Sequence, residues 1–152
     1  MSEKFIYKYL SDENLKSISA KIEKIEKLTS GELVITIKEK RGWLEKSKSV
    51  RKLAEKEFFE AKIGRTKDAT GILLFMIFNA KEFCILADKH INEKVEESVW
   101  DEIANNISQH FRQNKFCDGL LDAIEQTGKI LASHFPIQPN DINELSNEVR
   151  LK

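Results

Sequence analysis

The stretch GILLFMIF, which runs from Gly71 to Phe78, is a short and continuous apolar run. Its length predicts a strand that is buried on both faces, although a buried helix segment shows the same pattern. The turn-like NAKE of residues 79–82 closes the run, and FCILA at residues 83–87 repeats it. Because a connection of about four residues is too short for a parallel crossover, the two runs are predicted to form an antiparallel hairpin.

A helix and a further strand are expected before the hairpin. After Ser11, a good N-cap, apolar residues recur every three or four positions as far as about Thr29, which predicts an amphipathic helix. Residues Glu32 to Lys38 alternate apolar and more polar side chains, as a half-buried strand does. A second helix over Ser47 to Lys62 separates this strand from Gly71, so we expect a right-handed βαβ crossover that makes the two strands parallel.

Two more helices and a tail follow the hairpin. One helix is predicted from about Glu96, and another follows Asp118 as its N-cap and ends before Pro136. Gly128 lies inside the last helix, where it costs about 1 kcal/mol relative to alanine, so we expect close packing there. The tail from Ile137 is polar, and the sequence leaves open whether it is ordered or flexible. We therefore expect one α/β domain at residues 1–136, with helices on both faces of a mixed sheet, and a C-terminal tail at residues 137–152.

Composition and charge argue against several classes of protein. The chain has 152 residues, the size of one domain, and its 25 Lys and Arg equal its 25 Asp and Glu, so a nucleic-acid partner is not expected. No stretch approaches the roughly 20 apolar residues that span a bilayer, and Met1 to Leu10 lacks the apolar core of a secretion signal. No membrane insertion is therefore expected. Cys84 and Cys117 match neither a disulfide framework nor a zinc spacing. We expect a cytoplasmic monomer.

Three acidic residues are predicted to meet at one edge of the sheet. The entry of the first hairpin strand and the exit of the second lie side by side, which brings Asp68 near Asp88. Parallel strands start at the same edge, so Glu32 is expected beside them. Oxygen ligands from separate segments are typical of a site for a hard cation, Ca²⁺ or Mg²⁺. The alternative is that these carboxylates only cap helices and solubilise the surface.

Two other side chains have both functional and structural interpretations. His90 lies beside Asp88, where it could act as a general base or a metal ligand, although a solvated loop histidine is the more common case. Trp43 lies in the loop after the first strand, at the opposite edge from the carboxylates. An exposed Trp43 would mark a surface for a partner protein, whereas a buried one would cover the second helix. Serine nucleophile, P-loop and dinucleotide signatures are absent from the sequence.

Several short motifs in a fixed order resemble those of the TPM domain family, and together they cover about residues 11–136. The motifs include TSGELVI at residues 29–35, KD at 67–68 with GILL at 71–74, and DKHINEKV at 88–95. They look closest to the compact bacterial members that lack a signal or a membrane anchor. The resemblance implies a three-layer αβα sandwich and, in some members, calcium bound near the acidic edge of the sheet. It also implies a phosphatase activity that has been attributed to the family.

The sequence predicts a cation-binding or partner-binding module in preference to an efficient enzyme, because no activated nucleophile or well-placed base is visible. Two alternatives stay open. In a metal-dependent phosphatase, Asp68 and Asp88 would hold the cation and His90 would protonate the leaving group. In a metal-free scaffold, the acidic edge would only be solvated. The basic residues available to bind phosphate in the first alternative are Arg65, Lys67 and Lys89.

Overall fold

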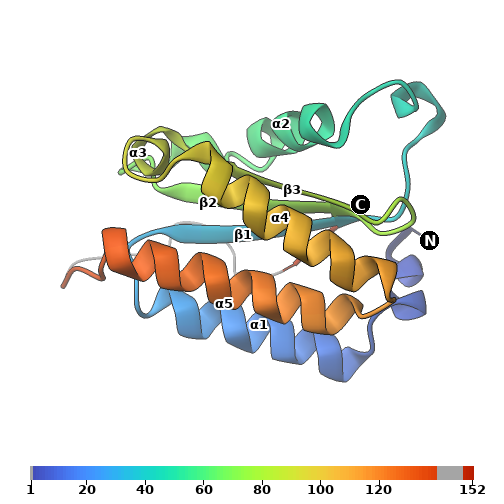
Figure 1. Ribbon diagram of the computed structural model, residues 1–152, viewed down its shortest axis with the longest axis horizontal. Coiled ribbons are helices and arrows are strands. Elements are labelled where there is room, and N and C mark those ends of the chain that lie inside the picture. The colour runs from blue at the N-terminus through green and yellow to red at the C-terminus, as the bar shows by residue number, and fades with distance from the viewer. Residues whose placement is uncertain (1, 140–148) are drawn as a thin grey trace.

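The computed structural model describes residues 2–139 and 149–152 and places them in a sheet with helices on both sides (Figure 1). The strands lie in the order β3-β2-β1-β4, with β1 parallel to β2 and β4, and β2 antiparallel to β3. Their bounds are β1 (Glu32–Lys38), β2 (Gly71–Ile77), β3 (Glu82–Ala87) and β4 (Arg150–Leu151). The predicted mixed sheet, with its parallel pair and its hairpin, is confirmed.

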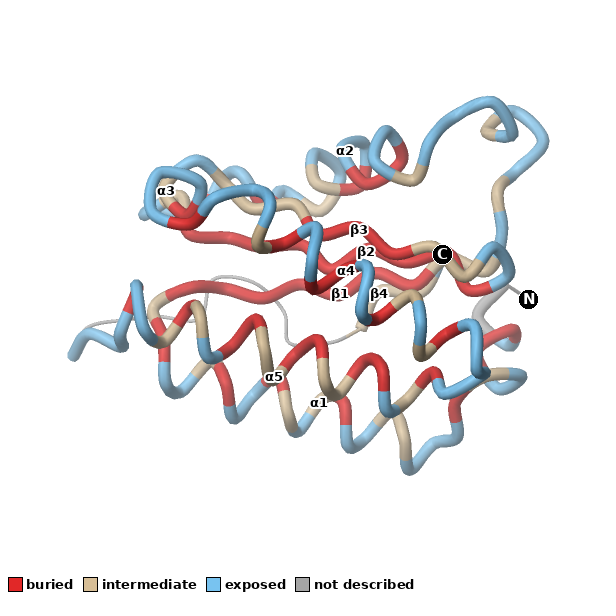
Figure 2. The backbone as a smooth tube through the Cα atoms, in the orientation of Figure 1, coloured by how far each residue is buried: buried red, intermediate tan, exposed pale blue. Residues whose placement is uncertain are grey.

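Helices form a layer on each face of the sheet. Helix α2 (Val50–Glu60) covers one face, and α1 (Asp12–Glu26), α4 (Glu97–Arg112) and α5 (Phe116–His134) cover the other (Figure 1). The strands between the layers are buried along most of their length (Figure 2). Shorter helical turns occupy the connections, namely η1 (Ser2–Lys8), η2 (Trp43–Glu45), η3 (Ile63–Arg65) and α3 (Lys89–Asn92). The architecture is the expected αβα sandwich.

Strand β1 is buried on both faces, although its alternating sequence predicted a half-buried strand. Leu33 faces the core beneath α1 and α5, and Val34 faces the core beneath α2. Thr36 is fully buried as well, and its hydroxyl donates a 2.6 Å hydrogen bond to the carboxylate of Glu57 on α2. The prediction was wrong because a buried hydroxyl with a strong acceptor needs no contact with solvent.

The last helix starts earlier than expected, and the end of the tail, which the sequence left open, pairs with the sheet. Helix α5 begins at Phe116, so Asp118 lies in its first turn and is not its N-cap. The ring of Phe116 belongs to the core, and its burial favours the earlier start. The last residues of the tail add strand β4, where the Lys152 amide donates to the Ile37 carbonyl at 2.8 Å. Residues 140–148 of the tail lie outside the described part, and the domain boundary after residue 136 stays a prediction.

Close packing at Gly128 is confirmed. A Cβ atom on Gly128 would lie 2.3 Å from the Cδ1 atom of Ile25, a distance that real side chains do not allow. The missing side chain therefore lets α5 approach the last turn of α1. This contact fixes the end of α1, and with it Glu26, beside the start of β1.

Candidate cation site

The starts of β1 and β2 and the end of β3 meet at one end of the sheet, which we call the acidic end. Glu32, the first residue of β1, pairs in register with Gly71, the first residue of β2. The Glu32 amide donates to the Thr70 carbonyl at 3.0 Å, and the Asp88 amide donates to the Gly71 carbonyl at 2.9 Å. The segments that carry the predicted acidic residues thus lie side by side, as the topology argument required.

Hydrogen bonds join the loop before β2 to the start of α3. The His90 amide donates to the Ala69 carbonyl at 3.1 Å, and the His90 ring nitrogen Nδ1 lies 3.0 Å from the Asp68 carbonyl oxygen. The edge of the His90 ring also packs on Phe135, with 5.3 Å between ring centroids. His90 therefore joins two loops and the end of α5, a structural role in addition to any chemical one.

One carboxylate oxygen of Asp88 is hydrogen-bonded, and the other has no hydrogen-bond partner among the described residues. Asp88 is the N-cap of α3, and its Oδ1 accepts a 2.7 Å hydrogen bond from the Lys89 amide. Its Oδ2 is buried and has no hydrogen-bond partner among the described residues, and the same holds for the Thr66 hydroxyl in the loop before β2. Buried oxygen atoms that lack partners call for an explanation, and a bound ion is one of the usual ones.

Asp68 presents its side chain to solvent, while its neighbour Ala69 adopts a strained backbone. The φ angle of Ala69 is 53°, in the left-handed region, which costs a residue with a Cβ about 1–2 kcal/mol. Two hydrogen bonds hold this turn. The Ala69 amide donates to the Thr66 carbonyl at 3.3 Å, and the His90 amide donates to the Ala69 carbonyl. Ligand sites often retain strain of this kind because the contacts around them determine the conformation.

Two carboxyl side chains, those of Glu26 and Glu32, lie close together where α1 ends beside β1. Glu32 is 4% exposed, and Glu26 lies at the last position of α1. Burial, followed by repulsion from Glu32, raises the pKa of Glu26 to about 8, although a hydrogen bond from the Leu33 amide opposes this shift. Glu26 therefore holds a proton at neutral pH. A cation at the acidic end would offset the repulsion from Glu32, which is the smaller of the two causes that raise this pKa.

No three His, Cys, Asp or Glu side chains within residues 2–139 and 149–152 are grouped as a ready set of metal ligands. Glu32, Asp68 and Asp88 arrive on neighbouring segments, and their role as ligands stays a prediction. A cation at this end would need further oxygen atoms from backbone carbonyls, hydroxyls or water. Such mixed oxygen sets are typical of Ca²⁺.

Sequence reasoning did not find Glu26 or Thr66. In the helical pattern, Glu26 stands among charged residues that were expected on the solvated face of α1. Its partial burial is a tertiary effect, because Glu26 lies beside Glu32 and the Leu33 amide at the start of β1. Thr66 lies in a polar loop whose path could not be predicted, and no local signal marks it.

Comparison with a family model agrees with this architecture. The model of the TPM domain, under the name TPM_phosphatase, matches residues 7–130 of the chain. A comparison with curated proteins gave no match. Within the described ranges, no helix is both long enough and apolar enough to cross a membrane.

Solved structures share the fold. The NMR structure of the BA42 protein from the psychrophilic bacterium Bizionia argentinensis has a TM-score of 0.83 and 34% identity, and the match covers 95% of this chain and 96% of that one. The N-terminal domain of a P. gingivalis protein has a TM-score of 0.69 and 15% identity over 84% of this chain and 79% of that one. The N-terminal domain of the cg2496 protein from Corynebacterium glutamicum has a TM-score of 0.58 and 8% identity, and the match covers 92% of this chain and 79% of that one. The last two similarities concern the fold alone.

Proposed function

Because the chain belongs to the TPM domain family, we propose that it is a binding module that holds a divalent cation, Ca²⁺ in preference to Mg²⁺, at the acidic end of its sheet. The observation that carries the proposal is the buried Oδ2 of Asp88, which has no hydrogen-bond partner among the described residues. A buried carboxylate oxygen without a partner costs free energy. Coordination to a hard cation offsets that cost.

The chemistry of the acidic end favours Ca²⁺. Glu32 at the start of β1 and Asp88 just after β3 would supply carboxylates, and the exposed Asp68 could turn toward the same end from the adjacent loop. Mg²⁺ demands a near-ideal octahedron of ligands, whereas Ca²⁺ accepts six to eight oxygens that include carbonyls and water in a flexible arrangement. A site with few carboxylates, completed by water and other neutral oxygens, would therefore suit Ca²⁺ better.

A calorimetric titration of the purified protein with CaCl₂ and with MgCl₂ tests the proposal. We expect Ca²⁺ to bind more tightly than Mg²⁺ and Asp88→Asn to weaken Ca²⁺ binding at least about tenfold, since asparagine keeps the cap acceptor but removes the charge. The matched control is Asp118→Asn in the first turn of α5, which should leave binding unchanged. Equal Ca²⁺ affinity in wild type and Asp88→Asn would refute the site.

A metal-dependent phosphatase is the second candidate. The observation in its favour is that Arg65 and Lys89 lie exposed in the two loops of the acidic end, where they could bind phosphate. The His90 ring is held by the contact of its Nδ1 atom with the Asp68 carbonyl, so a proton transfer in this candidate would have to use Nε2. A p-nitrophenyl phosphate assay separates the candidates. We expect negligible turnover with Ca²⁺ or Mg²⁺, and robust turnover that both Asp68→Ala and Asp88→Ala abolish would favour the phosphatase. A metal-free scaffold would show neither binding nor turnover.

A further inference from the structure

The end of the sheet opposite the carboxylates carries a projecting loop of residues 39–49, which we call the η2 loop. Figure 1 shows it extending beyond β1 and α2, and Figure 2 shows that most of it is exposed. Trp43 and Leu44 lie at its tip, with 79% and 72% of their surfaces exposed. The alternative that Trp43 covers the second helix is therefore wrong. Two adjacent large apolar side chains at a convex tip cost free energy in water.

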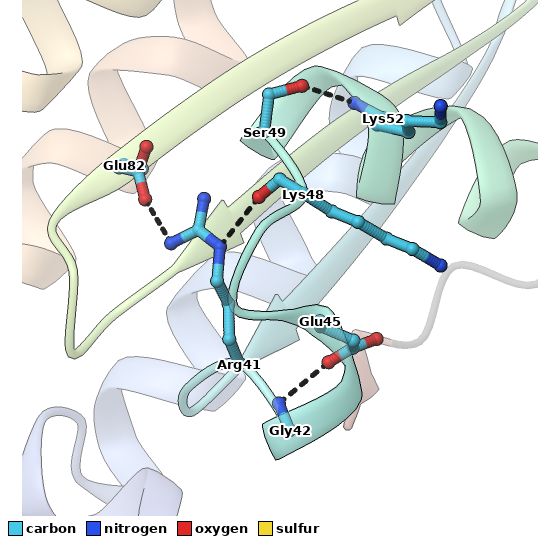
Figure 3. Close-up of polar contacts among 7 residues, drawn as sticks. All are labelled: Arg41, Gly42, Glu45, Lys48, Ser49, Lys52 and Glu82. Carbon is cyan, nitrogen blue, oxygen red and sulfur yellow. Dashed lines mark hydrogen bonds and ion pairs between the residues drawn. The ribbon is translucent and has the colours of Figure 1, made fainter.

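Hydrogen bonds and an ion pair hold the η2 loop in a defined conformation. Arg41 lies at the centre of this support, with its Nη1 atom 2.6 Å from the Glu82 carboxylate on β3 and its Nε donating to the Lys48 carbonyl at 2.9 Å (Figure 3). The Gly42 amide donates to the Glu45 carboxylate at 2.8 Å and closes the turn. The supported turn displays Trp43 and leaves its ring without a covering layer.

Positive charge surrounds the apolar tip. Residues 38–52 contain seven basic and two acidic residues, although Arg41 and Arg51 are paired with Glu82 and Glu97 from outside this segment. Both acidic residues are engaged, because Glu39 pairs with Lys8 at 3.5 Å and Glu45 pairs with Lys38 at 3.2 Å. Four exposed lysines make no ion pair within the described part of the chain, and they are Lys40, Lys46, Lys48 and Lys52.

We propose that the η2 loop docks the protein on an anionic lipid surface, with Trp43 and Leu44 inserted among the headgroups and the four lysines against the lipid phosphates. Tryptophan favours the interface between water and lipid, and lysine stems can lie along apolar surface while their ammonium groups remain in the polar layer. Each lysine near an anionic surface contributes about 1 kcal/mol. The contact is peripheral and requires no spanning helix.

The shape of the tip favours lipid over a partner protein. A stable protein interface buries about 800 Å² on each side, far more than two side chains on a narrow convex loop can supply. A bilayer needs only a small apolar tip and a ring of positive charge, and both are present. The negative charge of acidic lipid headgroups is complementary to the exposed lysines of the η2 loop.

Vesicle co-sedimentation with the full chain in EDTA tests this docking independently of any bound cation. We expect binding to vesicles of phosphatidylcholine and phosphatidylglycerol in equal amounts, and none to phosphatidylcholine alone. Tryptophan emission should shift to shorter wavelength on binding. The signal reports on Trp43, because Trp100 is 1% exposed.

Two variants and two matched controls make the test specific. Trp43→Ser with Leu44→Ser, and Lys46→Glu with Lys48→Glu, should each weaken binding at least about tenfold while thermal melting shows an intact fold. Phe59→Ser, at a residue 75% exposed near the end of α2, and Lys16→Glu with Lys24→Glu on α1 should bind like the wild type. Wild-type binding by the η2-loop variants, or no binding to anionic vesicles, would overturn the proposal. In the latter case an acidic protein would be the remaining occupant of the loop.

Discussion

At the scale of single residues, the acidic end shows what sequence reasoning can find and what it cannot. Glu32 and Asp88 were placed at one end because strand direction alone determines which ends meet. The partial burial of Glu26 depends on how the end of α1 lies beside the start of β1, which the helical pattern of α1 does not encode. Glu57 had a signal that was overlooked, since it stands three and four residues after the inward-facing Ala54 and Leu53 of α2.

The buried Glu26 predicts an unusual pH dependence of stability. Its pKa is raised to about 8 in the folded protein by burial and by Glu32, so the folded state binds more protons than the unfolded state between about pH 4.5 and 8. The free energy of unfolding should therefore fall as pH rises through this window and level off above it. With allowance for solvent screening, the loss is on the order of 2 kcal/mol.

Urea unfolding in EDTA at several pH values measures this effect. Glu26→Gln should flatten the decline between about pH 4.5 and 8, because the glutamine cannot titrate. Below this range, stability should fall in both proteins as Glu57 and Glu45, whose pKa values are lowered, become protonated. Parallel profiles for wild type and Glu26→Gln between pH 5 and 8 would show that Glu26 titrates normally.

At the scale of elements, the hairpin and the crossover followed from run lengths and connection lengths, whereas β4 did not. Two residues inside a polar tail have no detectable strand pattern. They pair with β1 because Glu57 on α2 binds the tail, through Arg150 at 2.8 Å and Lys152 at 3.3 Å. Burial alone would raise the pKa of the Glu57 carboxyl group. The hydrogen bonds from Thr36 and Arg150 outweigh burial and lower this pKa, so Glu57 is charged at neutral pH.

Glu57→Ala should destabilise the protein by about 2–3 kcal/mol, because it leaves the buried Thr36 hydroxyl without an acceptor and removes the anchor of β4. Arg150→Ala should cost less, about 1 kcal/mol, since Arg150 is partly exposed. Thermal or chemical denaturation of the two variants gives the comparison. If Arg150→Ala lowered the free energy of unfolding as much as Glu57→Ala does, the hydrogen bond between Thr36 and Glu57 would contribute nothing to stability.

At the scale of the whole molecule, the two ends of the sheet differ in chemistry. The predicted carboxylates lie where β1 and β2 begin, although Arg65, Lys67 and Lys89 stand in the same segments. Exposed lysines flank the η2 loop, which follows the other end of β1. A net charge of zero predicts no overall positive field, but it does not reveal how the charges are distributed over the fold. Net charge is a sum, and a sum cannot reveal opposite charges held at opposite ends by the fold.

The most direct test of the central claim, a cation site at the acidic end, is a titration of ¹⁵N-labelled protein with CaCl₂ followed by amide chemical shifts. The largest changes should map to residues 66–71, to Asp88–His90 and to Glu32, since backbone hydrogen bonds join these segments at the acidic end, where Oδ2 of Asp88 is buried without a partner among the described residues. The amides of the η2 loop should not move. If the resonances of the acidic end stay unchanged up to millimolar Ca²⁺, or if the shifts map elsewhere, the proposed site is wrong.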